Sequence, residues 1–236
     1  MRRLAVFILG TSIAAVLGFG APACITDTYA DYQALGAGGC SIGDATFSNF
    51  SAPGFLNSGV PTISPDQIEL EPGGTMDDPT LTLVYLSGGA PTPVVVNSTG
   101  QIFSMGIQYT LTVTGGATLN TIQMDSTFAN TAPGRVTATK SASSGGSTFI
   151  SSVSDGGASN PLATYDGNTQ AVSGSSPWTI NDTISLQAQT GGSVTAAGFE
   201  NLFDLTPGTA TTPEPSTLAL LGVGLLALGW RRAAKA

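Results

Sequence analysis

The sequence predicts an all-β chain with one folded domain, a single antiparallel β-sandwich of jelly-roll type. Short segments rich in Val, Ile, Leu and Thr recur at intervals of roughly 10–20 residues, with Gly, Pro, Asn and Ser between them. Residues 102–113 alternate between apolar and polar side chains, which is the period of a half-buried strand. Residues 24–206 contain no capped apolar face with the 3.6-residue period of a helix. A long series of short strands of this kind favours a sandwich.

The predicted strands follow one another along the domain. They are 67–70, 80–86, 94–97, 102–113, 119–124, 135–140, 148–153, 178–180, 183–189 and 199–205. Residues 115–116 and 155–160 are predicted loop tips, because they are rich in glycine and polar residues. The predicted core consists of aliphatic side chains together with the larger Phe47, Phe50, Tyr85, Phe103, Tyr109, Phe149, Trp178 and Phe199.

Residues 1–23 have the three parts of a secretory signal peptide. Met1-Arg2-Arg3 is charged, residues 4–19 are apolar, and Ala21-Pro22-Ala23 offers small residues for cleavage before Cys24. Two alternatives remain open: cleavage after Ala30, which would discard Cys24, and lipidation of Cys24. The segment predicts export by the Sec route.

The only two cysteines of the chain are Cys24 and Cys40. In an exported protein such a pair predicts one disulfide, because the compartment is oxidising. A closed loop of about 17 residues contributes on the order of 3 kcal/mol in the chain-entropy model. A nucleophilic thiol is the alternative, but the chain has no histidine and no nearby cation that would lower the pKa of a thiol.

The segment between Cys24 and Pro213 is strongly acidic. It holds fourteen acidic and two basic residues, a net charge of −12. This charge excludes nucleic acid as a partner, because phosphate binding requires clustered Lys and Arg. It also favours solubility and is compatible with divalent cations.

Composition argues that the domain is not an enzyme. The absence of histidine from the chain excludes Ser-His-Asp and Cys-His arrangements. Lys140, the only lysine of the domain, has no serine three residues before it, so the serine–lysine pattern is not met. The remaining catalytic alternative is a hydrolase that uses Glu69 and Glu71, which share one strand face.

We expect no cofactor, with calcium as the alternative. Asp77-Asp78 and Asp166-Gly167-Asn168 offer hard oxygen ligands, so that Asp77, Asp78, Asp166 and Asn168 are the calcium candidates. Neither group has the spacing of an EF-hand loop or of a nonapeptide repeat. Asp-Gly-Asn is also ordinary turn chemistry. For a carbohydrate site, Tyr165 and Trp178 are the candidate aromatic side chains.

The C-terminal end, 213–236, combines three signals after a linker at 207–212. They are the tripeptide Pro213, Glu214 and Pro215, an apolar run at 217–230, and the basic residues Arg231, Arg232 and Lys235. As a helix, 216–230 spans roughly 22 Å, which suffices for a transmembrane segment if the flanking arginines reach the interface. The positive charges keep this end in the cytoplasm, so the extended tripeptide lies outside the membrane. A permanent membrane anchor is the alternative.

This order of tripeptide, helix and basic end resembles the sorting tail of the PEP-CTERM family of exosortase-processed bacterial surface proteins. The start of the domain, with Gly39-Cys40-Ser41 before Phe47 and Phe50, is similar to a recurrent group of ectodomains in that family. The resemblance implies that an exosortase recognises and cleaves the tail after transient anchoring in the inner membrane.

The resemblance also implies a non-enzymatic protein of the cell surface or extracellular matrix. Its expected role lies in the cell envelope, the exopolysaccharide or the biofilm matrix, with polysaccharide or other matrix components as partners. The alternative function is a carbohydrate- or calcium-binding β-sandwich module on the cell surface.

Overall fold

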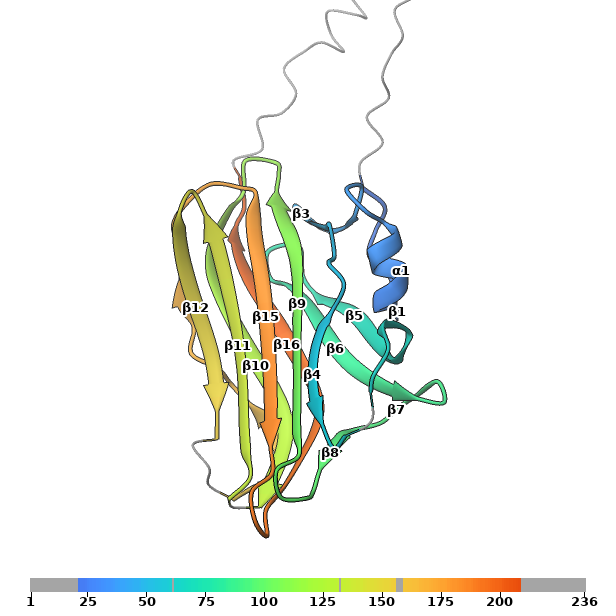
Figure 1. Cartoon of the computed structure of the whole chain (residues 1–236). Coiled ribbons are helices and arrows are strands. Elements are labelled where there is room, and N and C mark those ends of the chain that lie inside the picture. Colours follow the sequence, from blue (N-terminus) through green and yellow to red (C-terminus); the bar gives the residue numbers. More distant parts are fainter. Residues whose placement is uncertain (1–20, 61, 132, 156–158, 209–236) are drawn as a thin grey trace, which may run out of the picture.

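The computed structural model describes residues 21–60, 62–131, 133–155 and 159–208 (Figure 1). Most of the predicted signal peptide, the end of the linker and the whole sorting tail, with the transmembrane helix predicted in it, lie outside these residues. Within the described ranges, no helix has the length and apolarity needed to cross a membrane.

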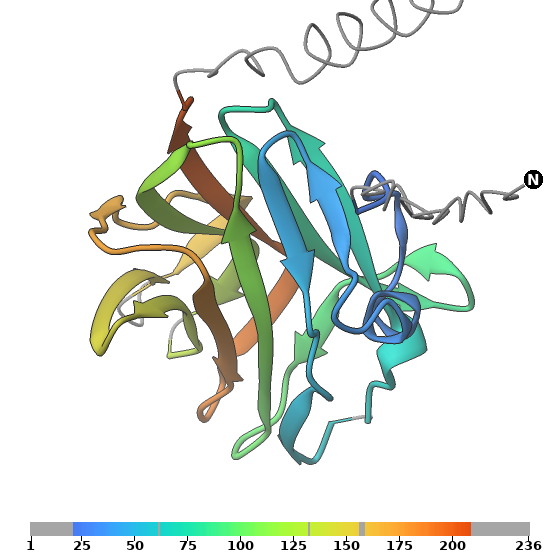
Figure 2. The ribbon, with the colours of Figure 1, turned by 90° about the horizontal axis from the view of Figure 1, so that it is seen from above.

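Two antiparallel sheets pack face to face, which confirms the predicted β-sandwich (Figures 1 and 2). In sheet I the strands follow the order β1 (Asp27–Thr28), β5 (Ile68–Gly74), β6 (Pro79–Ser87), β16 (Ser193–Thr206), β10 (Thr118–Thr131) and β13 (Asn160–Tyr165). Three short strands extend sheet I: β7 (Ala90–Pro91) on β6, β8 (Val94–Val96) on β16, and β14 (Gln170–Ala171) on β10.

Sheet II forms the front layer in Figure 1. Its order is β12 (Ser147–Ser154), β11 (Arg135–Ser144), β15 (Trp178–Gln187), β9 (Ile102–Val113), β3 (Ala45–Ser48) and β2 (Cys40–Ile42), with β4 (Gly54–Ser58) on the other half of β9. The chain changes sheet between β9 and β10 and again between β10 and β11, so strands that are adjacent in sequence line opposite walls of one core.

Most strands arise where the sequence predicts them. Strand β9 has the predicted bounds, and its apolar side chains alternate into the core as expected. The predicted segments 178–180 and 183–189 are one strand, β15, because Asn181 and Asp182 continue the ladder to β9 and β11. The predicted series lacks the short strands β1, β2, β3, β4, β7, β13 and β14. Much of β13 is exposed at the sheet edge.

The expectation of a domain without helices is wrong in two places. Helix α1 (Tyr29–Ala34) is capped by Thr28, whose hydroxyl accepts from the backbone N–H of Asp31 at 3.2 Å, and a 3₁₀ turn covers Pro65–Gln67. Six residues are too few to show a helical period. The two tyrosines of α1 nevertheless share one buried face: the Tyr29 hydroxyl donates to Ser51 O and the Tyr32 hydroxyl to Ile25 O, both at 2.8 Å.

The core lies between the sheets and contains the predicted large side chains, with Phe149 only half-buried. Phe50 stacks on Tyr109 with ring centroids 5.2 Å apart, and Phe149 meets Trp178 edge-on at 6.1 Å. The aromatic residues that the prediction missed are Tyr29, Tyr32, Phe128 and Phe203.

Candidate functional site

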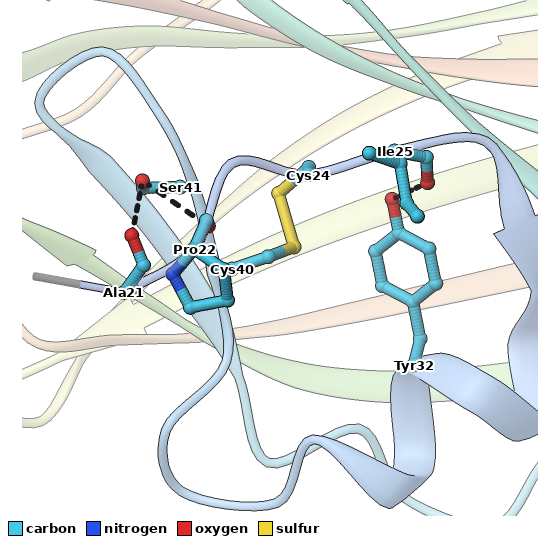
Figure 3. Close-up of a disulfide and its surroundings, with 7 residues drawn as sticks. All are labelled: Ala21, Pro22, Cys24, Ile25, Tyr32, Cys40 and Ser41. Carbon is cyan, nitrogen blue, oxygen red and sulfur yellow. Dashed lines mark hydrogen bonds between the residues drawn. A yellow bond between two sulfur atoms is a disulfide. The ribbon is translucent and has the colours of Figure 1, made fainter.

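A disulfide between Cys24 and Cys40 fastens the start of the domain to strand β2 (Figure 3). The two Cα atoms are 4.8 Å apart, so the predicted pairing is present in the structure. Backbone hydrogen bonds run beside it: Cys24 N donates to Ser41 O at 3.0 Å, and Ser41 N donates to Pro22 O at 2.7 Å. The Ser41 hydroxyl also donates to Ala21 O at 3.1 Å.

These contacts bear on where the leader is removed. Cleavage after Ala30 would remove Tyr29 from the core and divide α1, so the packing favours cleavage nearer Cys24. Lipidation of Cys24 would require the sulfur that bonds Cys40. Cleavage after Ala23 would also remove the Pro22 carbonyl that accepts from Ser41.

Sequence reasoning missed a polar cluster in the middle of the core. Lys140 from β11, Asp182 from β15 and Tyr109 from β9 point inward from sheet II. Asn201 from β16 points inward from the facing sheet I. Lys140, Asp182 and Asn201 expose no surface, with fractional exposures of 0%. We call these four residues the core polar cluster.

Lys140 reaches from sheet II to the facing sheet. It stands directly opposite Asp182 in the β11–β15 register, yet its ammonium Nζ donates to Gln123 O at 2.9 Å and Leu202 O at 3.1 Å. The same Nζ lies 3.9 Å from the centre of the Phe203 ring. Its tip is therefore held against the backbone of β10 and β16, next to Asn201.

The polar atoms of the other cluster members do not have hydrogen bonds like those of Lys140. Both carboxyl oxygens of Asp182, both polar atoms of the Asn201 amide and the Tyr109 hydroxyl are buried without a hydrogen bond of ordinary geometry to any residue that the structure describes. The Tyr109 hydroxyl and the Asn201 amide lie close enough to the Asp182 carboxyl to affect its pKa. An unsatisfied buried polar group is costly, so such a cluster requires an explanation.

Burial changes the protonation of the cluster. Desolvation lowers the pKa of Lys140 to about 7, against the opposing effect of Asp182, and raises the pKa of Asp182 to about 6, against the opposing effect of Lys140. Burial, followed by the charge of Asp182, raises the pKa of Tyr109 well above its usual value. A neutral amine and a protonated carboxyl are thus both accessible near neutral pH.

The calcium candidates make different contacts in the structure. Asp78 lines a pocket of about 240 Å³, whereas the Asp77 carbonyl accepts from Leu205 N at 2.7 Å. The Asn168 side-chain oxygen accepts from Ser152 N at 2.6 Å, so it is engaged with backbone. Across the described ranges, no three Asp, Glu, Cys or His side chains gather where a metal ion would sit.

The structure also locates the residues that the sequence offered as catalytic or carbohydrate-binding candidates. Glu69 and Glu71 lie on the same face of β5; partial burial and then the charge of Glu71 raise the pKa of Glu69. Trp178 is 1% exposed, so the hypothesis that it stacks on a sugar is wrong. Tyr165 stacks on Phe128 with ring centroids 4.3 Å apart, and its hydroxyl donates to Pro161 O.

The pocket that includes Asp78 opens on sheet I. It is lined by Asp78, Thr80, Thr121, Gln123, Leu202, Phe203 and Asp204. Two carboxylates, two hydroxyls and one amide thus surround one hollow. No local pattern in the sequence indicates this pocket, because its residues come from β6, β10, β16 and the turn before β6.

Fold and termini together define the class of protein: a disulfide-linked β-sandwich domain followed by a C-terminal sorting signal. The chain carries the PEP-CTERM protein-sorting motif at residues 211–233. This match confirms the predicted resemblance of the tail, and the motif implies an exported, cell-surface protein whose tail an exosortase processes.

No curated protein matches the chain. Among solved structures, TmCBM61 in complex with β-1,4-galactotriose overlaps with a TM-score of 0.33 at 13% identity, over 66% of this chain and 89% of that chain. A carbohydrate binding module of family 29 overlaps with a TM-score of 0.24 at 18% identity, over 74% of this chain and 97% of that chain. The enzymatically active domain of tailspike protein 4 from bacteriophage CBA120 overlaps with a TM-score of 0.26 at 11% identity, over 66% of this chain and 19% of that chain. Overlaps this weak carry no argument about ligands.

Proposed function

We propose that the protein is a non-enzymatic component of the cell surface or extracellular matrix, released from a membrane-bound precursor by an exosortase. One observation carries this: the sorting motif begins at residue 211, five residues after the last strand, β16, ends at Thr206. Strand β16 lies inside sheet I between β6 and β10. Cleavage at Pro213-Glu214-Pro215 would therefore free the sandwich without removing any part of its core.

Replacing Pro213 and Pro215 by alanine is expected to leave nearly all of the protein in the inner membrane with its tail attached. Alanine permits helix where proline forbids it, so the extended tripeptide outside the membrane is lost. Fractionation of native-host cells into inner membrane, outer surface and medium measures this. Pro207→Ala, a linker proline before the motif, is the matched control and should be distributed like wild type. A double variant that still reaches the surface without its tail would contradict the proposal.

The charge of the domain supports a particular kind of matrix partner. A net charge of −12 over residues 24–213 repels anionic polymers. A neutral polysaccharide has hydroxyls that carboxylates and side-chain amides bind directly. The pocket includes two such carboxylates, those of Asp78 and Asp204, among its lining residues. Binding of a neutral polysaccharide in this pocket is the second candidate function.

Asp204→Asn together with Asp78→Asn tests this second function. The exchange keeps the size of both side chains but removes two charged acceptors, whose hydrogen bonds contribute about 1.5–3 kcal/mol each. Retention on the host's own purified polysaccharide is expected to fall at least tenfold. Glu69→Gln together with Glu71→Gln on β5 is the control, because it removes the same two negative charges away from the pocket. Equal retention of the double variant and wild type would exclude the pocket.

A further inference from the structure

We propose that Lys140 and Asn201 become joined by an amide bond that ties sheet II to sheet I, with Asp182 as the group that moves the proton. This is a covalent modification made by the domain on itself. It does not depend on the sorting of the protein or on its ligand.

The placement of the three side chains carries the inference. Lys140, Asp182 and Asn201 are fully buried. Lys140 and Asp182 lie on β11 and β15, neighbouring strands of sheet II, and Asn201 lies on β16 in the facing sheet I. Nζ of Lys140 is bonded to the carbonyl of Leu202, the residue that directly follows Asn201. The Asn201 amide in turn interacts with the Asp182 carboxyl. Amine, carboxamide and carboxyl are thus gathered at one point of the core.

The surroundings suit the reaction. A lysine becomes nucleophilic when it is desolvated in an apolar site and loses its proton. The Phe203 ring lies 3.9 Å from Nζ, and Lys140 exposes no surface, so its amine has no direct contact with bulk water. Burial lowers the pKa of Lys140 and raises that of Asp182, so the pair made of a neutral amine and a protonated acid lies much closer in free energy to the ion pair than it does in water.

The step balances without an external reagent. The lone pair of the neutral Lys140 Nζ attacks Cγ of Asn201, while the protonated Asp182 carboxyl donates its hydrogen bond to the amide oxygen. Asp182 then takes a proton from the attacking nitrogen and passes one to the amide NH₂ group. The Cγ–Nδ2 bond breaks, ammonia leaves, and Asp182 is again protonated. One N–C bond is formed and one is broken, and no atom is oxidised.

This reaction also explains why polar groups persist at the centre of the core. An asparagine and an aspartate without ordinary hydrogen bonds destabilise a merely packed core. As reactants they are required at that place. The product is an uncharged amide, so the buried amine of Lys140 no longer carries a charge at any pH.

Trypsin offers a direct test, because Arg135 and Lys140 are the only basic residues between Cys24 and Pro213. The full-length protein is denatured, reduced, digested with trypsin and analysed by mass spectrometry. An unlinked chain releases the free peptide of residues 136–140. A linked chain is not cut after Lys140, because its amine is acylated, and gives a single peptide from Val136 to Arg231 that contains both Lys140 and Asn201 and is lighter by one ammonia.

Variants of Asn201 and Asp182 identify the residues that take part in forming the amide bond. Asn201→Ala should restore complete cleavage after Lys140, and Asp182→Ala should do the same although Lys140 and Asn201 remain. Asn181→Ala, an asparagine on the outer side of β15, is the matched control and should stay uncut. Release of residues 136–140 from wild-type protein in full amount would overturn the proposal, whether or not the variants fold. A peptide lighter by one water and linked to Asp182 would overturn the assignment of Asn201.

Discussion

Replacing Trp178 with alanine is expected to lower the free energy of unfolding by about 3–5 kcal/mol. Trp178 opens β15, is 1% exposed, and pairs in register with Leu111 of β9. Its indole packs edge-on against Phe149 at 6.1 Å. A Cβ built on Gly174 would come within 2.9 Å of the indole, so backbone closes over the ring from that side. Truncation leaves a cavity that rigid strands cannot collapse to fill.

Urea unfolding of the purified variant and of wild type, both with the disulfide intact, measures this loss. Leu162→Ala is the control, since Leu162 on β13 is 58% exposed and its truncation should cost less than about 1 kcal/mol. A fully stable Trp178→Ala protein would contradict the packing described here.

Removing the disulfide by Cys24→Ser together with Cys40→Ser is expected to cost about 3 kcal/mol. The bond closes a loop with a sequence separation of 16, which contains α1 and its buried tyrosines. Without it, the unfolded chain gains conformational freedom, while the pairing of β1 with β5, of β2 with β3 and of the backbone around Ser41 remains in the folded state. The double variant avoids a free thiol that single variants would leave.

A reducing agent provides the matched control for this prediction. Wild-type protein in dithiothreitol should lose about the same 3 kcal/mol in urea unfolding. The double variant should unfold at the same urea concentration with and without the reductant. If reduction leaves wild-type stability unchanged, Cys24 and Cys40 do not form a stabilising bond.

Much of this architecture could be predicted because its signals are local. Strand β9 alternates over its whole length, so its bounds and its inward face follow from the sequence. The pairing of Cys24 with Cys40 follows from there being only two cysteines in an exported chain. The sorting motif is contiguous and was recognised from its three parts in order.

The core polar cluster could not be predicted, because it depends on which strands face each other. Asn181-Asp182 looks like a break between two strands, since polar pairs usually mark turns. In the structure it is the middle of β15, with Asp182 pointing inward opposite Lys140. Lys140 and Asn201 are 61 positions apart, and only the crossing of the chain between sheets brings them together. Helix α1 was missed for a simpler reason, its length of six residues.

We propose that this sandwich is delivered outside the cell by removal of both ends of the chain. Mass spectrometry of the terminal peptides, on protein recovered from the envelope and medium of its native host, tests it most directly. We predict a mature chain that begins near Cys24 and ends near Pro213, and retention of residues 218–230 in the Pro213→Ala, Pro215→Ala variant. A wild-type product that still carries residues 218–230 would show a permanently anchored ectodomain and contradict the account.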